Sequence, residues 1–474
     1  MAADSDTLVF YDVTRLVSRR RAPVATGIDR IDLHFARAVL DAYGERCLPV
    51  VKVGKRAFLA DRPLIERLVA SLEGAWFDGA AHNIGNARAL ESAGLTQKIE
   101  APSRTNVAYE EQAAGPITRL SRSALRPPRL AGLYLRSRLG NLLRRDLRNA
   151  VPALMAEGRS GVYVVCSHGG AARLPGLLSG LREACGLRSL AYVHDLLPLD
   201  YPEYFLPGKP EGFARFLSEL AAAKASFIAN SRDTAVRLEA YSRRQGWTLS
   251  PVPVIWPGVE PSSPSPAAPK ATDQTETPYF VVIGTIEPRK NHLLLLQIWR
   301  DLALSGQRPM PYLHIVGRRG WENQSVLNLL DRCEAIQPHV SEHSSLPDPD
   351  LRGLVAGARA VLFPSFAEGF GMPVLEALQL GARVIAADLP VLREFAGDAP
   401  LYLDPLDARS WRHEILDAAE KPRSVTATPP LVTEEIGWEA RSRQFLDSLA
   451  DVAAAPTSRL AATEPSMAHL KLQT

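Results

Sequence analysis

AVLFPSFAEGFGMPVLE, residues 360–376, is the stretch that decides the fold. The run AVLF at its start predicts a buried parallel strand, and Pro373 suits the first turn of a helix that begins at Met372. The loop between strand and helix contains two glycines, Gly369 and Gly371. A strand, a glycine-containing loop and a helix in this order form the repeating unit of a doubly wound α/β domain.

Short apolar runs alternate with helical patterns on both sides of this stretch. In the second half, buried strands are expected at residues 279–285, 312–317, 360–365, 383–388 and 399–404. In the first half, they are expected near residues 7–11, 161–166, 189–193, 226–229 and 253–255. Helices are expected at residues 27–39, 411–419 and 433–450. The pattern therefore predicts an α/β protein with two Rossmann-like parallel-sheet domains facing across a cleft.

A Pro-, Ser- and Thr-rich segment with almost nothing to bury divides the chain and reads as a linker. The length of 474 residues suits two domains of about 150–250 residues each. The expected parts are an N-terminal domain (1–260) with a basic insertion near 96–150, the linker (261–278), a C-terminal domain (279–430), a terminal helix packing back on the N-terminal domain (431–455) and a disordered tail (456–474).

The composition excludes several classes of protein. No run approaches the ~20 apolar residues that a membrane helix needs, and the start MAADSDTLVF lacks the apolar region of a secretory signal. We therefore expect a cytoplasmic protein. A net charge of +3 is too small to indicate a nucleic-acid partner. The cysteines have no zinc-ligand spacing and are expected to be reduced and structural; they are Cys47, Cys166, Cys185 and Cys333.

The loops that follow the strands should carry the chemistry, because ligands of open α/β sheets bind beyond the carboxyl ends of the strands. After the strand at 279–285, Gly284 allows a ligand to approach the backbone closely. Arg289 and Lys290 then place two cations at the sheet edge, where they suit a diphosphate. The alternative is a solvated basic turn before a helix.

The loop before the predicted helix at Met372 combines an anion site with acids. The amides of Gly369, Phe370 and Gly371 lie at the positive end of the helix dipole, which favours an anion. Glu368 and Glu376 would repel that anion, but carboxylates accept hydrogen bonds from sugar or ribose hydroxyls. The alternative is that each glutamate only complements the helix N-terminus.

Together these segments resemble the family-four retaining glycosyltransferases of the GT-B fold. The resemblance rests on the E-x₇-E spacing, the run GFGMPVLEAL, the turn GTIEPRKN and the segment VGRRGW, and is dense from 279 to about 404. It implies that Arg289 and Lys290 bind the donor diphosphate. It further implies that Glu368 contacts the transferred sugar and that Glu376 holds the ribose, with the Gly369–Gly371 amides meeting phosphate or sugar.

The first half resembles the acceptor domain of bacterial mannosyl- and rhamnosyltransferases in the same family. In ATGIDR, Gly27 resembles the glycine near the donor phosphates. In YVHDLLPLDYPEYF, the resemblance implies that His194 lies close to the transferred sugar. Asp195 and Ser231, the latter in FIANSRDTA, are candidates for the acceptor side. A structural role for His194 and a helix cap at Asp195 remain alternatives.

The triplet Asp348-Pro-Asp350 spells a D-x-D motif, which in another glycosyltransferase fold holds a metal. Here it precedes a helical pattern, so capping of that helix is expected instead. The basic turn supplies the countercharge that a metal would bring. We therefore expect no metal and no cofactor besides the nucleotide diphosphosugar donor.

Residues 119–148 contain nine arginines and one acid, Asp146. Leu139, Leu142, Leu143 and Leu147 can share one face of a helix. This pattern is compatible with a basic amphipathic helix on an anionic inner-membrane surface, where a lipid-linked acceptor would be found. An exposed helix whose leucines pack on the N-terminal domain explains it equally well.

Taken together, the sequence indicates a retaining hexosyltransferase that moves a sugar to a glycan or polyprenyl-linked glycan acceptor in bacterial surface-polysaccharide synthesis. By resemblance, the leading donor is GDP-mannose, ahead of dTDP-rhamnose and UDP-sugars. The alternatives are a nucleotide-sugar 2-epimerase, for which no additional acid–base pair is evident, and a nucleotide-sugar-binding scaffold without catalysis. A Rossmann dehydrogenase is disfavoured because no G-x-G-x-x-G follows a strand.

Overall fold

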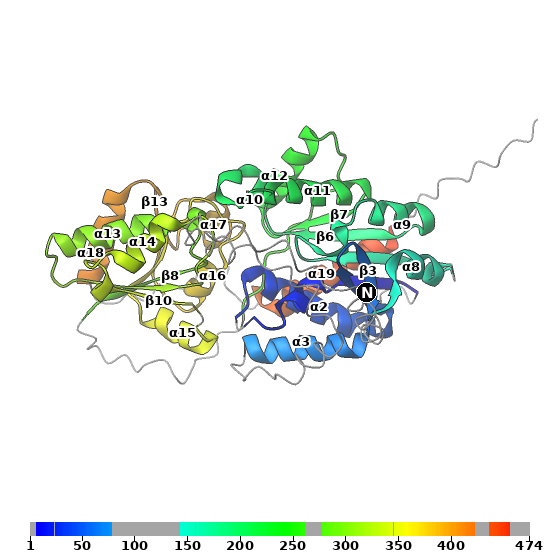
Figure 1. The fold of residues 1–474 in the computed structure, drawn as a ribbon, viewed down its shortest axis with the longest axis horizontal. Helices are drawn as coiled ribbons and strands as arrows, with labels where there is room; N and C mark the ends of the chain where they lie inside the picture. The colour runs from blue at the N-terminus through cyan, green and yellow to red at the C-terminus, as the bar shows by residue number, and fades with distance from the viewer. Residues whose placement is uncertain are drawn as a thin grey trace, which may run out of the picture.

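The computed structural model describes residues 6–22, 24–77, 143–156, 158–260, 277–344, 346–421 and 436–455. Within them the chain forms two α/β domains side by side (Figure 1). The first has a seven-stranded sheet of order β4-β3-β2-β1-β5-β6-β7, and the second a six-stranded sheet of order β10-β9-β8-β11-β12-β13. The prediction of two Rossmann-like domains is confirmed.

In the first sheet, β1 pairs parallel with β2 and β5, whereas β3 pairs antiparallel with β2 and β4 at one edge. The strands are β1 (Leu8–Asp12), β2 (Cys47–Val53), β3 (Arg56–Ala60), β4 (Leu143–Asp146), β5 (Gly161–Val165), β6 (Arg188–Val193) and β7 (Ser226–Ala229). The helices are α1 (Thr14–Arg19), α2 (Gly27–Tyr43), α3 (Arg62–Trp76), α8 (Leu147–Met155), α9 (Leu177–Cys185), α10 (Leu197–Asp200), α11 (Lys209–Ala222) and α12 (Arg232–Arg244).

The second sheet is parallel throughout the pairings of its strands. These are β8 (Tyr279–Ile283), β9 (Tyr312–Val316), β10 (Val340–His343), β11 (Ala360–Phe363), β12 (Val384–Ala387) and β13 (Leu401–Leu403). The helices are α13 (His292–Leu304), α14 (Gln324–Arg332), α15 (Asp348–Gly357), α16 (Met372–Gln379), α17 (Pro390–Ala396) and α18 (Ala408–Glu420).

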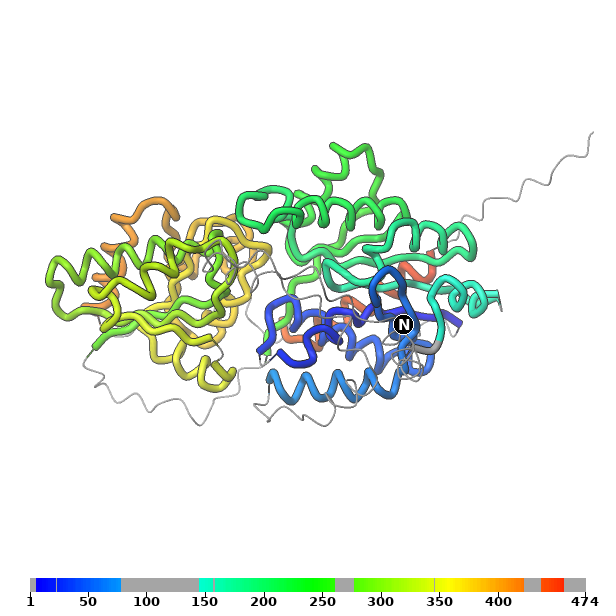
Figure 2. The backbone as a smooth tube through the Cα atoms, in the orientation of Figure 1, coloured from blue at the N-terminus to red at the C-terminus, as the bar shows by residue number. Residues whose placement is uncertain are grey.

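The last described helix, α19 (Trp438–Ala454), returns to the first domain, as the red end of the tube in Figure 2 shows. Phe445 stacks on Phe35 of α2 with ring centroids 4.2 Å apart, and Trp438 stacks on His34 at 4.0 Å. Both Phe rings are fully buried, so their apolar area holds the helix in place. The expected tail, 456–474, and linker residues 261–276 lie outside the described residues.

Two predictions in the first domain are wrong. Residues 253–255 form only an isolated bridge between Val254 and Ala229, where Pro253 has no N–H to donate to a sheet ladder. The helix face through Leu143 and Leu147 does not form either, because β4 pairs antiparallel with β3 and α8 begins only at Leu147. Asp146 caps α8, and Leu147 is fully buried. Residues 119–142, the rest of the basic segment, lie outside the described part.

Charged and polar contacts between loops and helix ends contribute to the domain interface. Glu394 of α17 accepts hydrogen bonds from the backbone N–H groups of Arg232 and Asp233 and from the indole of Trp256, at 2.7–3.3 Å. An acid at the N-terminus of α12 is favoured by the helix dipole. In the described residues, no helix is long and apolar enough to cross a bilayer.

Candidate active site

The basic turn begins where β8 ends. Gly284 has φ +145°, a conformation that L side chains rarely adopt, and a Cβ there would lie 3.0 Å from Cε of Lys290. A short 3₁₀ turn then presents Arg289 and Lys290, and Asn291 ends it in the left-handed region. The Asn291 amide donates to the carbonyls of Pro364 and Pro405, which fixes the turn against the loop after β11.

Both cations of the turn are paired with buried carboxylates. Arg289 Nη1 lies 2.8 Å from one oxygen of Glu368, and Lys290 Nζ lies 2.7 Å from the other. Arg289 Nη2 lies 2.6 Å from Glu287. The basic turn is therefore part of a compact charged cluster, and the interpretation as a solvated turn before a helix does not describe it.

The protonation states in this cluster follow from burial and charge. Burial would raise the pKa of Glu368, but Arg289 and Lys290 outweigh it and hold the pKa at about 2. Burial lowers the pKa of Lys290, although the charge of Glu368 opposes this shift. Burial raises the pKa of Glu287, although the charge of Arg289 opposes it. Glu368 is therefore an anion, and a diphosphate would compete with it for both cations.

The loop from Glu368 to Gly371 is pressed against the first domain. A Cβ on Gly369 would lie 2.6 Å from the carbonyl oxygen of His194, so this position accepts only glycine. Ser231 Oγ donates to the Gly369 carbonyl at 3.3 Å. The Phe370 ring is buried on Phe395, with centroids 4.6 Å apart. Phe370 can therefore meet a ligand only through its backbone.

His194, at the end of β6, forms the opposite wall. Its Nε2 lies 2.7 Å from the Cys166 carbonyl, so Nε2 carries the hydrogen and Nδ1 is an acceptor. No hydrogen-bond partner of Nδ1 occurs within the described residues. Burial lowers the pKa of His194 to about 4, which keeps the ring neutral. His194 can thus accept a hydrogen bond from a hydroxyl.

Asp195 connects this wall to the basic turn. Its Oδ1 accepts a hydrogen bond from the N–H of Leu197 at 3.1 Å, at the start of α10. Burial raises its pKa to about 6 although Arg289 attracts its anionic form. The bond to Leu197 forms a turn before α10, but α10 has no side-chain cap and its N-cap residue is Leu196, so the cap alternative for Asp195 is wrong. Asp195 lies within electrostatic reach of Arg289 and Glu368.

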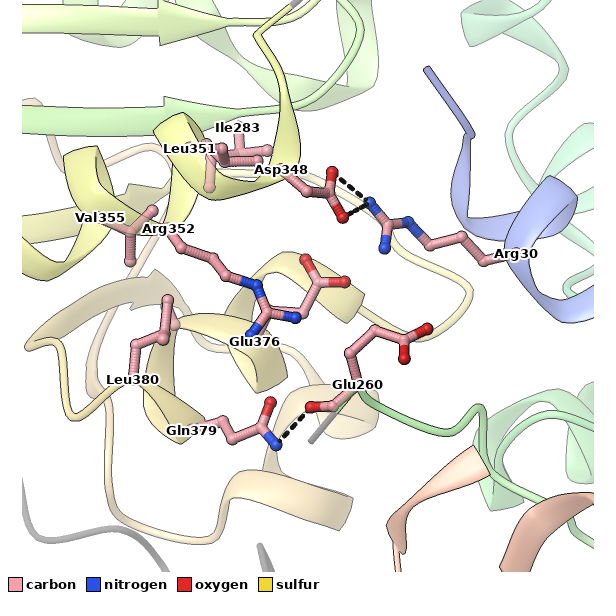
Figure 3. A pocket seen from close by; sticks show the side chains of 11 residues that line it. Arg30, Glu260, Ile283, Asp348, Leu351, Arg352, Val355, Glu376, Gln379 and Leu380 are labelled. Atoms are coloured by element: carbon pink, nitrogen blue, oxygen red, sulfur yellow. Dashed lines mark hydrogen bonds and ion pairs between the residues drawn. The ribbon is translucent and has the colours of Figure 1, made fainter. Parts of the chain in front are cut away.

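Glu376 lies in a different set of contacts from Glu368. It lines a pocket of about 40 Å³ between the domains (Figure 3), with Arg30 of α2, Asp348 and Arg352 of α15, and Glu260. Burial raises the pKa of Glu376, while Arg30 opposes this shift. The two glutamates thus serve separate ends of the interface, which suits a ligand long enough to reach both.

Gly27 also belongs to this end of the interface. It is the first residue of α2, whose capping box joins Thr26 to Asp29. A Cβ on Gly27 would lie 3.2 Å from Sδ of Met372, the first residue of α16. The N-termini of α2 and α16 therefore meet, and two helix dipoles point their positive ends at the same region.

The capping role expected for Asp348 is wrong. Helix α15 begins at Asp348 without a side-chain cap. Both Asp348 oxygens instead accept from Arg30 Nη2 at 2.8 Å, across the domain interface. Asp350 is exposed in the first turn of the helix. Among the described residues there is no group of three or more His, Cys, Asp or Glu that could hold a metal ion.

Sequence reasoning missed several residues of this site. His168 accepts a hydrogen bond from the backbone N–H of His194 at 3.2 Å, and Glu287 pairs with Arg289. His168 follows β5 just as His194 follows β6, so its place at a strand end was a usable signal. Arg30 had no such signal, because its partner Asp348 is 318 positions away.

Comparison with known proteins identifies the second domain. Residues 267–427 match the family described as "Glycosyl transferases group 1". This range contains β8 to β13, the basic turn and both glutamates. Over this range the second domain is therefore similar to group 1 glycosyl transferases.

The relatives in this comparison include proteins named as mannosyltransferases. The chain is 30% identical over 238 residues to "Serotype-specific mannosyltransferase WbdA" of Escherichia coli, covering 46% of this chain and 29% of that protein. It is 34% identical over 173 residues to "O-antigen chain mannosyltransferase B" of Escherichia coli, covering 36% and 45%. The chain thus spans less than half the length of these two relatives.

Among solved structures, the chain is similar to "Sucrose-phosphate synthase (tll1590) from Thermosynechococcus elongatus", with TM-score 0.49, 20% identity and coverage of 70% of this chain and 81% of that one. It is also similar to "Anabaena Alr3699/HepE in complex with UDP", with TM-score 0.48, 17% identity and coverage of 63% and 82%.

Proposed function

We propose that this protein is a retaining mannosyltransferase that transfers mannose from GDP-mannose to a glycan or lipid-linked glycan acceptor in surface-polysaccharide synthesis. The observation that carries the proposal is the Arg289–Lys290–Glu368 cluster, buried at the carboxyl ends of β8 and β11 inside a domain similar to group 1 glycosyl transferases. The names of two relatives, both mannosyltransferases, support mannose as the sugar.

In this proposal the donor diphosphate binds Arg289 and Lys290 and takes the place of Glu368 as their counterion. When the bond between the sugar and the β-phosphate breaks, negative charge develops on the leaving nucleoside diphosphate. Two fixed cations and the N-terminus of α16 stabilise that charge in a site largely closed to water. The same cations supply the countercharge, so transfer proceeds without a metal.

Glu368, released from the cations, accepts hydrogen bonds from hydroxyls of the transferred sugar, and Glu376 accepts them from the ribose. His194 Nδ1 supplies a neutral acceptor on the opposite side of the sugar. Asp195 and Ser231 lie on the acceptor side of the same gap. We assign no protein nucleophile: the acceptor proton passes to the leaving phosphate, and the sugar keeps its anomeric configuration.

Binding and transfer can be tested separately. We expect GDP to raise the unfolding temperature more than UDP or dTDP at equal concentration, because the favoured nucleotide binds only the folded state. We expect labelled mannose to move from GDP-mannose to an oligomannoside. A protein that converts the free nucleotide sugar to its 2-epimer, or that binds GDP-mannose without turning it over with any acceptor, would contradict the proposal and favour the epimerase or the scaffold.

A further inference from the structure

A group of aromatic residues at the domain interface takes no part in the donor chemistry described above. It consists of Tyr201, Tyr204 and Phe205, which follow α10 in the first domain, together with Trp321 after β9 and Phe366 after β11 in the second. We call these five residues the aromatic wall. They come from three loops far apart in the sequence, so only the closed domain arrangement brings them together.

The rings of the wall lie along one another. Tyr201 and Tyr204 are stacked with centroids 6.0 Å apart, and Tyr204 and Phe366 are stacked at 6.0 Å with an interplanar angle of 11°. Phe205 lies 6.4 Å from Trp321, whose indole N–H donates to the Tyr204 carbonyl at 2.9 Å. The wall thus consists of two groups of rings, Tyr201–Tyr204–Phe366 and Phe205–Trp321, joined by the hydrogen bond from Trp321 to the Tyr204 carbonyl.

These rings are not part of a hydrophobic core. All five side chains are half-buried, and none belongs to the three core clusters formed by the described residues. Large aromatic side chains left half-exposed and held together in this way are typical of binding surfaces, where the ring offers apolar area and a polar edge at little cost in side-chain entropy.

The loop that carries three of the rings is held by contacts within the protein. At its start, Asp195 accepts a hydrogen bond from the N–H of Leu197 at 3.1 Å. Further along, Asp200 pairs with Arg237 of α12 at 3.0 Å. The indole N–H of Trp321, from the other domain, donates to the Tyr204 carbonyl. A surface held in place by its neighbours loses little freedom when it binds, which favours affinity for a weakly held ligand.

The wall lies next to the proposed sugar site. The backbone N–H of Phe366 donates to the Arg289 carbonyl at 2.8 Å, and Glu368 is two residues further along the chain. The loop with Tyr201 and Tyr204 begins at Asp195, opposite that turn. By contrast, the pocket lined by Glu376 shares no residue with the wall. The wall therefore lies at the end of the site that contains Arg289 and Glu368, where the proposed transfer of the sugar takes place.

From this placement we infer that the aromatic wall is the acceptor subsite, and that it binds the pyranose rings of a glycan by stacking against their apolar C–H faces. The inference rests on the proposed function and assigns the acceptor class to the same site. Sugars expose a face of C–H groups and an edge of hydroxyls, which matches rings flanked by tyrosine hydroxyls and by Asp195. A nucleobase also stacks on rings, and the experiment separates the two ligands.

The test uses the full chain with octyl α-mannobioside as the glycan probe and GDP as the nucleotide probe. Saturation-transfer NMR measures glycan binding, and calorimetry measures GDP binding. The variants are Tyr204→Ala, Trp321→Ala and Trp321→Phe, which keeps a ring. Tyr241→Ala is the control, because Tyr241 packs edge-on against Trp247 at the far end of α12.

We expect Tyr204→Ala and Trp321→Ala to weaken mannobioside binding about fivefold to tenfold, as the loss of one aromatic contact predicts. Trp321→Phe should restore part of the binding, and Tyr241→Ala should leave it unchanged. GDP affinity should stay the same in all four variants. Unchanged glycan binding in Tyr204→Ala, no glycan binding by the natural protein, or a parallel loss of GDP binding would overturn the inference. Failure of the proposed function itself would appear instead as absent GDP binding with glycan binding intact.

Discussion

At the scale of single residues, the site is organised by charge compensation. Glu368 pairs with both Arg289 and Lys290, and these two cations hold its pKa at about 2. Burial lowers the pKa of Lys290, and the charge of Glu368 opposes that shift. In the proposed function, a diphosphate would replace Glu368 as the counterion of two cations that are already in place.

Arg289→Ala and Lys290→Ala should each lower kcat about a hundredfold or more, because each removes a donor to the charge that develops on the leaving group. Donor affinity should fall less than kcat, since the second cation still binds the ground state. Steady-state kinetics with the donor varied measures both quantities. Arg443→Ala on the exposed face of α19 is the matched control. An unchanged kcat in either site variant contradicts the role assigned to that cation.

His194 should make stability depend on pH. Its pKa is about 4 in the folded protein against 6.5 when exposed, so below pH 6.5 the unfolded chain binds a proton that the folded one does not. The stability that neutral, buried His194 contributes is thus fully present above pH 6.5 and is lost as the pH falls toward 4. Between pH 7 and pH 5 the loss should be about 2 kcal/mol.

Denaturant unfolding at several pH values checks this prediction on the natural protein and His194→Gln. The variant should lose less stability over the same range, since glutamine does not titrate. Equal slopes for the two proteins would show that His194 does not carry the effect.

At the scale of elements, glycine loops set how closely the domains approach. A Cβ on Gly369 would lie 2.7 Å from Cβ of Asp195 as well as against the His194 carbonyl. Gly369→Ala should therefore push the loop off the first domain, lower stability by about 1–3 kcal/mol and reduce transfer sharply.

The control for this substitution is Gly180→Ala in helix α9, where an added Cβ meets nothing within 4 Å. Alanine is a better helix former than glycine, so this variant should be as stable as the natural protein or slightly more stable. Thermal unfolding and transfer assays on both variants decide the matter. Full activity in Gly369→Ala would mean that the contact with His194 is not needed.

The sequence predicts buried elements well and edge elements poorly. The apolar runs AVLF and YFVVI predict β11 and β8, because buried parallel strands are apolar on both faces. The strands β4 (LRRD) and β10 (VSEH) were missed, since edge strands are short and polar and show no apolar run. The antiparallel pair of β2 and β3 was not predicted either, because Pro49 and Lys52 interrupt the apolar run of β2.

The candidate site divides in the same way. Arg289, Lys290, Glu368 and Gly369 could be predicted because they lie within short loops whose spacing carries their chemistry. Their pairing could not be predicted in detail, nor could the contact between Arg30 and Asp348. Contacts between domains depend on how two separately folded units meet, and no local pattern encodes that geometry.

At the scale of the whole molecule, the polar contacts between the domains include Arg30 with Asp348 and Glu394 with the N-terminus of α12. Glu394→Ala should leave three donors without this partner and loosen the arrangement. Small-angle scattering should then show a larger radius of gyration, and the donor KM should rise. Glu439→Ala, which removes an exposed ion pair within α19, is the control. Identical scattering curves for the natural protein and Glu394→Ala would contradict this account of closure.

The central claim is metal-free transfer of mannose with retention, and one measurement tests it directly. GDP-mannose and octyl α-mannoside are incubated with the full chain in excess EDTA, and proton NMR follows the anomeric signals. We expect that GDP is released and that an α-linked mannobioside appears at the same rate as without EDTA. A β-linked product, a strict requirement for added Mg²⁺ or Mn²⁺, or a donor that is never consumed would contradict it.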